Sequence, residues 1–265
     1  MNKYDLRKKQ LKMLKGLIEI HRICQLHNIN YWLDAGTLLG AVRHSGFIPW
    51  DDDIDICMFR DDYNKFINIA KYELNTNDFF LQTVTTDKDY IFINIPCKLR
   101  INNTEIVEKF EKIHNCYNEK SHHGLFVDIF PYDKYSENKN KRKIQRLLSI
   151  AYKIKKLSYC NNIGAIKYIL SRIFSIILPI IILEKTKNII ANKMNKEPNN
   201  SLYGAGIETP FTRAYFSEDE IFPLKKNFFE GYEFNCPNNT KIYLEKMFGP
   251  NYMTPPPEEE RYNHS

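Results

Sequence analysis

Residues 51–56 constrain this chain more than any other stretch. They read Asp-Asp-Asp-Ile-Asp-Ile, so Asp51, Asp53 and Asp55 alternate with residues of another kind. Because successive side chains of a strand point to opposite faces, the pattern predicts a strand over residues 52–58. Its acidic face is expected to line a cleft, and its isoleucine face to join the core.

Three carboxylates on one short strand repel one another unless a cation or raised pKa values relieve them. Hard divalent cations prefer oxygen ligands, so the acids predict a site for Mg²⁺, with Mn²⁺ as the alternative. An EF-hand calcium loop is a competing interpretation, since Asp62 falls at its twelfth position. That loop needs glycine at position six, where this chain has Ile56.

Gly36 and Thr37 follow an apolar run over residues 31–33 and open a helical pattern over residues 37–43. This order predicts a strand, a glycine turn and a helix N-terminus. Backbone N–H groups at such a turn bind phosphate oxygens. We therefore expect phosphate at the helix start, beside metal held by the next strand.

A second carboxylate source lies in residues 125–130, Leu-Phe-Val-Asp-Ile-Phe. Burying an unpaired Asp128 in such a strand is costly, so it should meet a cation, a donor or solvent. It is either a third acid of the metal site or a general base on an acceptor hydroxyl. The alternative is an aspartate that caps the turn before Pro131.

Residues 79–85 and 91–101 are rich in aromatic and β-branched residues and predict two strands. Lys98 and Arg100 share a face of the second strand. If that face lines the cleft, the two cations neutralise substrate phosphates. The alternative is a solvated edge of the sheet.

The composition is that of a globular protein, with 43% apolar and 14% aromatic residues in 265. The six cysteines form no Cys-x-x-Cys pair and no zinc-ligand cluster, which favours reduced thiols in a cytoplasmic protein. The N-terminus lacks the apolar core of a secretory signal. We expect a cytoplasmic location.

Residues 134–197 differ from the rest in charge. Residues 134–172 contain eleven basic residues and one acidic residue. The apolar run at residues 173–183 is far too short to span a bilayer. A basic amphipathic helix followed by an apolar patch fits docking of residues 139–183 on anionic lipid. A helical subdomain with a buried apolar run fits equally well. Nucleic acid is not an expected partner, since no recognition motif accompanies the charge.

The C-terminal third predicts a loop at residues 198–210, a strand at residues 227–234 and a helix at residues 238–248. The proline-rich tail after residue 254 has the composition of a disordered polyproline segment.

The run D-A-G-T-L-L-G-A-V-R-H-x-G-F-I-P-W-D-D-D-I-D, from Asp34 to Asp55, resembles the core of the LicD family of bacterial choline-phosphate transferases. Fukutin and fukutin-related protein are animal relatives of that family. Further matches lie at residues 125–131 and at the C-terminus, where the matching residues are Tyr252, Met253, Pro255, Pro256, Arg261 and His264.

The resemblance implies a fold of the DNA-polymerase-beta-like nucleotidyltransferase type. That is an α+β fold with a mixed β-sheet flanked by helices, here a single domain over residues 1–265 with residues 134–197 as a helical basic insertion. It also implies a tail that packs back near the cleft. The implied catalytic acids are Asp53, Asp55 and Asp128, with Asp51 as a further metal ligand.

The implied activity is metal-dependent transfer of phosphocholine from CDP-choline to a hydroxyl of a cell-surface glycan, with release of CMP. The acceptor would be a lipid-linked lipopolysaccharide or teichoic-acid precursor at the inner face of the cell membrane. The substrate-binding candidates are Gly36, Thr37, Arg43, Lys98 and Arg100. Choline is best held by aromatic faces, and the candidates for that cage are Trp32, Trp50 and Tyr132, although core packing is the commoner fate of such residues.

Two other functions remain open. One is transfer of another CDP-linked alcohol such as ribitol phosphate, because no residue in the sequence specifies the alcohol. The other is a non-catalytic membrane-associated protein that kept the fold, which the intact acids at positions 51, 53, 55 and 128 disfavour.

Overall fold

A computed structural model describes residues 3–210 and 214–261. Its centre is a seven-stranded mixed sheet in the order β1-β2-β5-β4-β3, and β5 also pairs with β6, which pairs with β7. Only β2 and β5 run parallel; the other neighbouring pairs are antiparallel. The strands are Trp32–Leu33 (β1), Asp55–Phe59 (β2), Phe79–Gln82 (β3), Cys97–Ile101 (β4), Phe126–Tyr135 (β5), Leu202–Ala205 (β6) and Phe216–Ser217 (β7).

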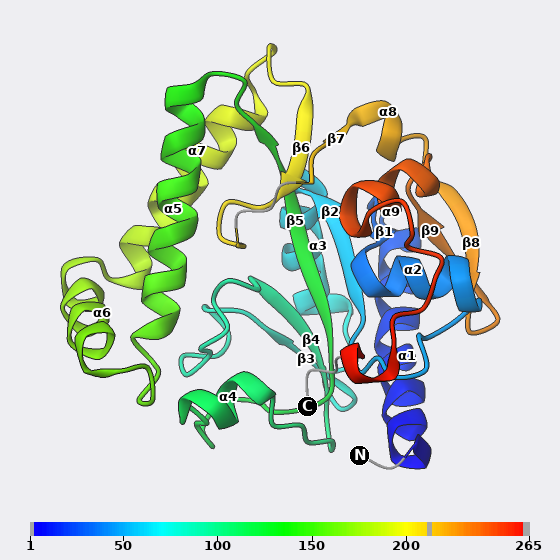
Figure 1. Ribbon diagram of the computed structural model, residues 1–265, viewed down its shortest axis with the longest axis horizontal. Helices are drawn as coiled ribbons and strands as arrows, with labels where there is room; N and C mark the ends of the chain where they lie inside the picture. The colour runs from blue at the N-terminus through cyan, green and yellow to red at the C-terminus, as the bar shows by residue number, and fades with distance from the viewer. Residues whose placement is uncertain (1–2, 211–213, 262–265) are drawn as a thin grey trace.

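Helices flank the sheet, and a two-stranded hairpin lies beside α2 (Figure 1). The elements outside the insertion are α1 (Lys3–Leu26), α2 (Ala35–His44), α3 (Arg60–Glu73), α4 (Lys109–His114), α8 (Glu218–Ile221), β8 (Lys225–Phe229), β9 (Tyr232–Cys236), α9 (Thr240–Phe248) and the 3₁₀ turn Glu258–Glu260. The expected α+β fold with a mixed sheet between helices is confirmed, and it is compatible with a nucleotidyltransferase-like arrangement.

The two faces of the sheet differ in chemistry. One face carries Val127, Leu99 and Ile101 against α1, where Gly16 brings the helix so close that an added Cβ would lie 3.2 Å from Val127 Cγ2. The opposite face carries the polar residues Asp55 of β2, Asp128 of β5, Lys98 and Arg100 of β4 and Gln82 of β3. The alternation of side chains along each strand produces this division.

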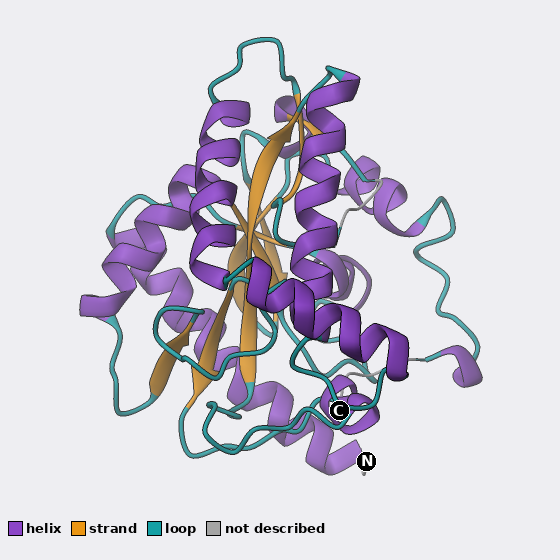
Figure 2. Ribbon diagram, turned by 90° about the vertical axis from the view of Figure 1, so that its left-hand side faces the viewer, coloured by secondary structure: helices purple, strands orange, loops and turns teal. Residues whose placement is uncertain are grey.

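The predicted insertion is helical. It contains α5 (Lys139–Leu157), α6 (Ala165–Ile177) and α7 (Ile180–Asn195), with Pro179 at the N-cap of α7. Figure 2 views the molecule from this side, with the helices in front of the sheet. Leu148, Ala151 and Tyr152 of α5 form a second small core with Leu183 and Ala191 of α7.

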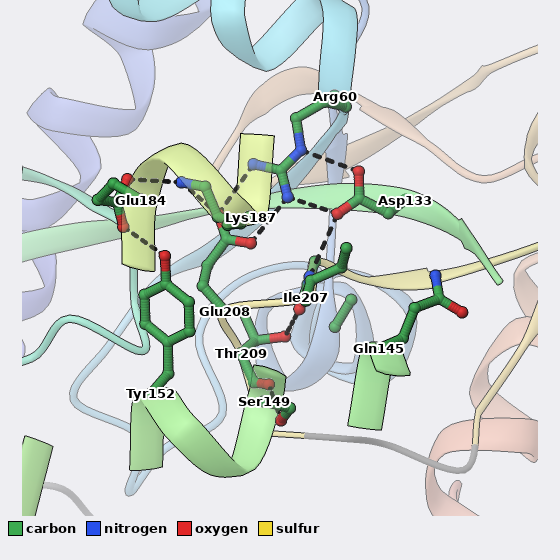
Figure 3. Close-up of polar contacts among 12 residues, drawn as sticks. Arg60, Asp133, Gln145, Ser149, Tyr152, Glu184, Lys187, Ile207, Glu208 and Thr209 are labelled. Carbon is green, nitrogen blue, oxygen red and sulfur yellow. Dashed lines mark hydrogen bonds and ion pairs between the residues drawn. The ribbon is translucent and has the colours of Figure 1, made fainter. Parts of the chain in front are cut away.

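A buried network of charges joins the insertion to the sheet (Figure 3). Arg60 at the start of α3 donates to both carboxylate oxygens of Asp133 on β5, at 2.9 and 2.5 Å. The same guanidinium donates to both oxygens of Glu208, at 2.8 Å each. Lys187 of α7 lies 3.5 Å from Glu208 and 2.7 Å from Glu184, which accepts from Tyr152 of α5. The network therefore holds α3, β5, α5, α7 and the segment after β6 together.

The network predicts acid sensitivity. Burial by itself raises the pKa of Glu208, but the positive charges of Arg60 and Lys187 outweigh it and lower the pKa to about 2. A depressed pKa gives stability that is present above the unfolded value and lost as pH falls through the folded one. We expect the free energy of unfolding to fall between about pH 4.5 and pH 2.

The measurement is urea unfolding at a series of pH values across that window. The Glu208→Gln variant is the control, because its amide does not titrate and the acid-dependent loss should be smaller. An equally steep loss in the variant would assign the acid sensitivity to other groups.

Several expected elements have different bounds in the structure. The helix predicted at residues 238–248 is confirmed, whereas the strand predicted at 52–58 begins only at Asp55. Residues 198–210, expected as a loop, contain β6, and the strand expected at 227–234 is the β8–β9 hairpin, which turns at Gly231 with φ 82°. The six cysteines are buried and free, as predicted.

Candidate active site

One row of polar residues crosses four strands of the sheet. Asp55 on β2 pairs in register with Asp128 on β5, Asp128 with Lys98 on β4, and Lys98 with Gln82 on β3. The Asp128 backbone N–H donates to the Ile54 carbonyl at 2.8 Å, which fixes the β2 register. Directly opposed residues share a face, so the pairing brings together the acids predicted from two separate strands.

Asp51 and Asp53 reach this site from the loop before β2, which corrects the expectation that all three acids lie on one strand. Asp53 is only 9% exposed. Asp51 lies against the first turn of α2, where a Cβ on Gly36 would be 2.8 Å from Asp51 Oδ2. The acids therefore cluster because a loop folds over the start of a helix.

Gly36 and Thr37 lie inside α2 rather than in a turn before it, because the helix begins at Ala35 with Asp34 as its N-cap. Thr37 Oγ1 accepts the Asp55 backbone N–H at 2.8 Å. This bond ties the first turn of the helix to the first residue of β2. The predicted neighbourhood of helix start and acids is present, although its local geometry differs from the expectation.

The cluster is strongly repulsive. Burial raises the pKa of Asp51 to about 9, and the charge of Asp53 and a hydrogen bond to Asp53 add to the effect. Burial likewise raises the pKa of Asp55 well above its usual range, together with the charges of Asp53 and Asp128. Perturbed carboxyl groups of this kind are typical of functional sites.

The Lys98 ammonium offsets the negative charge of Asp128. Burial raises the pKa of Asp128 to about 6, although Lys98 opposes the shift. Lys98 Nζ lies 3.0 Å from Asp128 Oδ1 and 3.2 Å from Glu108 Oε1. Within the described ranges, Asp128 Oδ1 is a buried oxygen that receives no hydrogen bond of good geometry.

Lys98 and Arg100 share the polar face as predicted, but neither meets solvent. They are 0% and 2% exposed, so the alternative of a solvated sheet edge is wrong. Arg100 donates to Gln82 at 2.6 Å and to the Gly124 carbonyl at 2.8 Å. The expected direct contact with substrate phosphates stays a prediction, and in this structure protein groups enclose both cations.

Asp34 is a site residue that the sequence reasoning missed. It is buried, and its carboxylate accepts from Tyr243 at 2.7 Å, from the Cys57 thiol at 2.9 Å and from Tyr132 at 3.4 Å. Its charge contributes to the raised pKa of Asp55. The available signal was its place at the head of the Asp-Ala-Gly-Thr motif.

The three aromatic cage candidates have different surroundings. Trp32 is fully buried and donates to the Tyr243 hydroxyl at 3.2 Å, and Tyr132 is 3% exposed. Both pack in the core, which is the alternative given above, and the expectation that they hold choline stays a prediction. Trp50 is partly exposed, and the Arg261 guanidinium lies 4.4 Å from its ring centroid.

The tail packs back beside the acidic loop, as the resemblance implied. Arg43 Nη1 donates to the Tyr252 carbonyl at 2.8 Å, and Arg261 stacks on Trp50, the residue before Asp51. Of the C-terminal residues in the resemblance, His264 lies outside the described residues.

A cavity of about 400 Å³ lies between α5 and the body of the protein. Its wall includes Arg146, Lys153 and Lys156 together with Phe110. The Lys156 ammonium lies 4.6 Å from the Phe92 ring centroid, and that of Lys98 lies 5.2 Å from the same centroid. The Phe92 ring thus lies between Lys156 of the cavity wall and Lys98, the ion-pair partner of Asp128. The basic residues of this cavity were not among the predicted site residues.

Burial lowers the pKa of Lys156 to about 8, against the pull of Glu108. Among the described residues, no carboxylate lies within ion-pair distance of its ammonium. Lys156 is half-buried, and its ammonium lies over the Phe92 and Phe110 rings. A half-buried cation with no carboxylate at ion-pair distance is well suited to an anionic ligand.

In the part of the chain that the structure describes, no three His, Cys, Asp or Glu side chains already form a metal-binding group. The acids nevertheless offer the oxygen donors that hard cations use. Their mutual repulsion, and an Asp128 Oδ1 that pairs with Lys98 but accepts no hydrogen bond of good geometry, fit a cation between the two strands.

Gly36→Ala tests the contact between the helix and the acidic loop. Alanine favours helix over glycine, but its Cβ would lie 2.8 Å from Asp51 Oδ2 and push the carboxylate away. We expect transferase activity to fall by about tenfold to a hundredfold, with little change in the thermal midpoint. Full activity would show that Asp51 needs no fixed position.

Gly40→Ala in the same helix is the matched control. An added Cβ there would lie 2.5 Å from the Gly46 backbone oxygen, which cannot move as a side chain does. This variant should lose stability, so the two glycines separate an effect on the site from an effect on the fold.

Comparison with known proteins agrees with this geometry. Residues 28–156 match the model of the LicD/FKTN/FKRP nucleotidyltransferase domain. The chain is 29% identical to the lipopolysaccharide cholinephosphotransferase LicD of Haemophilus influenzae, over 100% of this chain and 97% of that protein. It is also 42% identical to the human ribitol 5-phosphate transferase FKRP over 40 residues, which cover 15% of this chain and 8% of FKRP. The acids paired across β2 and β5 lie within the matched residues, so residues 28–156 hold a LicD-type nucleotidyltransferase domain.

Proposed function

We propose that this chain is a glycan-directed phosphotransferase that moves phosphocholine from CDP-choline to a hydroxyl of a cell-surface glycan and releases CMP. The similarity to LicD along the whole chain supports this class of reaction. The observation that carries the proposal is the register of Asp55 with Asp128, which gathers acids beside the first turn of α2.

The proposed cofactor is Mg²⁺ or Mn²⁺, held by Asp53, Asp55 and Asp128 with Asp51 as a further ligand. The support is chemical: crowded carboxylates with raised pKa values and one buried oxygen without a hydrogen bond. When bound, a divalent cation offsets the negative charge of the donor diphosphate and of the phosphoryl group in transfer.

The chain's own residues position the reactants and move one proton. The acceptor hydroxyl oxygen bonds to the phosphorus that carries choline, and the bond from that phosphorus to the CMP oxygen breaks. Where Asp128 serves as the general base rather than as a metal ligand, the hydroxyl proton passes to its carboxylate. The Lys98 ammonium lies 3.0 Å from Asp128 Oδ1 and stabilises the ionised form of Asp128.

The cavity beside α5 is the proposed place for an anionic part of a substrate. Lys156, Lys153 and Arg146 offer positive charge, and Phe110 offers an apolar wall. Trp50 is the remaining candidate for the choline cage, since its ring already has a cation on its face. We place the reaction in the cytoplasm at the inner face of the cell membrane, where a lipid-linked acceptor would be met.

The test incubates the purified chain and Mg²⁺ with CDP-choline or CDP-ribitol and with lipooligosaccharide or teichoic-acid acceptors. We expect acceptor-dependent CMP release with CDP-choline and a gain of one phosphocholine in the acceptor mass. Chelation of the metal should stop the reaction. CMP release with CDP-ribitol alone would favour the FKRP-like alternative, which the 40-residue match supports. No turnover with any donor would contradict the proposal.

A further inference from the structure

The helix α6 exposes an apolar face that packs on none of the residues that the structure describes. Its members recur at intervals of three and four residues, which places them on one side of a helix. Ile176 is 80% exposed and Ile166 is 76% exposed. We call this face the isoleucine surface; it consists of Ile166, Ile169, Leu170, Ile173, Ile176 and Ile177.

The other side of α6 is the one that packs. Ser171 is buried, Phe174 contacts the small core of the insertion, and the Ser175 carbonyl accepts from Lys155 of α5 at 3.1 Å. The apolar side of α6 is therefore exposed while the opposite side of the same helix packs on the protein. The first turn of α7 continues the exposure with Ile181 and Ile182.

Contiguous exposed apolar surface of this kind marks an interaction site. The charge around it selects the partner. Residues 139–195 contain thirteen basic residues and one acidic residue, Glu184, and α6 itself contains Lys167 and Arg172 but no acid. A second copy of this chain would bring the same positive charge to the contact, whereas an anionic bilayer offers both apolar chains and negative headgroups.

No single described helix is long and apolar enough to cross a membrane. The pair α6 and α7 meets the length and composition together, but the two helices bend by 72° at the break before α7. The bend and the one-sided periodicity fit helices that lie in the interface of a bilayer, with the apolar side in the acyl region.

We propose that the isoleucine surface and the surrounding basic residues of the insertion dock this protein on an anionic lipid bilayer. This inference stands apart from the donor and the reaction. The docking would place α5, and the cavity that its Arg146, Lys153 and Lys156 line, close to the headgroup layer.

The experiment measures co-sedimentation of the full chain with vesicles of phosphatidylglycerol mixed with phosphatidylcholine, and with vesicles of phosphatidylcholine alone. We expect binding to the anionic vesicles that weakens at about 0.5 M salt. A combined Ile169→Gln, Ile173→Gln and Ile176→Gln variant should bind at least about tenfold more weakly. Its thermal midpoint should not change, because the three side chains are exposed.

A matched pair of single variants controls for apolar surface in general. Leu170 and Leu26 are 60% and 59% exposed, but Leu26 lies at the end of α1. Leu170→Gln should weaken binding by about threefold, and Leu26→Gln should leave it unchanged.

Two results would overturn the proposal. One is equal vesicle binding by the triple variant and the wild-type chain. The other is absence of vesicle binding together with dimers in analytical ultracentrifugation that the triple variant loses, which would assign the surface to a second copy.

Discussion

Replacing Asp55 by asparagine is expected to lower acceptor-dependent CMP release on the order of a thousandfold, while the thermal midpoint stays the same or rises. Asp55 is half-buried and faces the charges of Asp53 and Asp128, so its carboxylate destabilises the folded state. An amide of the same size relieves that repulsion. Stability that rises as activity is lost is the signature of a functional site rather than a structural one.

The measurement pairs initial rates of CMP release with thermal unfolding of the same preparations. Asp61→Asn is the control, because Asp61 is an exposed acid in the first turn of α3. It should leave the rate unchanged. An Asp55→Asn variant with the wild-type rate would remove the acid cluster from the mechanism, and one that unfolds would make Asp55 structural.

Replacing Arg60 by methionine is expected to lower the free energy of unfolding by about 3–5 kcal/mol. Arg60 is 4% exposed and supplies four hydrogen bonds to Asp133 and Glu208, both of which are fully buried. Methionine fills much of the space but leaves Asp133 without its cation and Glu208 with only the Lys187 ammonium at 3.5 Å. The damage should include looser attachment of the insertion, since Glu208 also contacts Lys187 of α7.

Urea unfolding measures this prediction, with Arg22→Met as the matched control. Arg22 is 46% exposed and pairs with Glu19 on the surface of α1, where an ion pair contributes less than about 1 kcal/mol. Adding Asp133→Asn and Glu208→Gln to Arg60→Met should recover part of the loss, because no buried charge then lacks a partner. Equal losses in Arg60→Met and Arg22→Met would show that the network contributes little.

The acids of the candidate site could be predicted from the sequence, because the prediction depends only on residue types close together in the chain. The acid before an apolar strand predicted Asp55, and the single carboxylate in an apolar run predicted Asp128. The pairing of β2 with β5 then places the two residues opposite each other. The alternation argument was wrong for Asp51 and Asp53, because β2 begins only at Asp55 and these two residues lie in the loop before it.

The residues that surround the site could not be predicted from the sequence, because they come from segments far apart in the chain. Arg100 is buried by Gly124 and Gln82, and Trp32 and Tyr132 are core residues because Tyr243 of α9 bonds to both. Nothing near these residues in the sequence distinguishes a ligand contact from a core contact.

By itself, the sequence indicated the resemblance to the LicD family, the candidate acids and the basic character of residues 134–197, since each depends on residue type and local spacing. Only the tertiary structure decided which side chains face the site and which face solvent. The apolar residues of α6 show the physical reason most clearly: an amphipathic pattern defines a face, but whether protein or lipid covers that face depends on where the neighbouring helices lie.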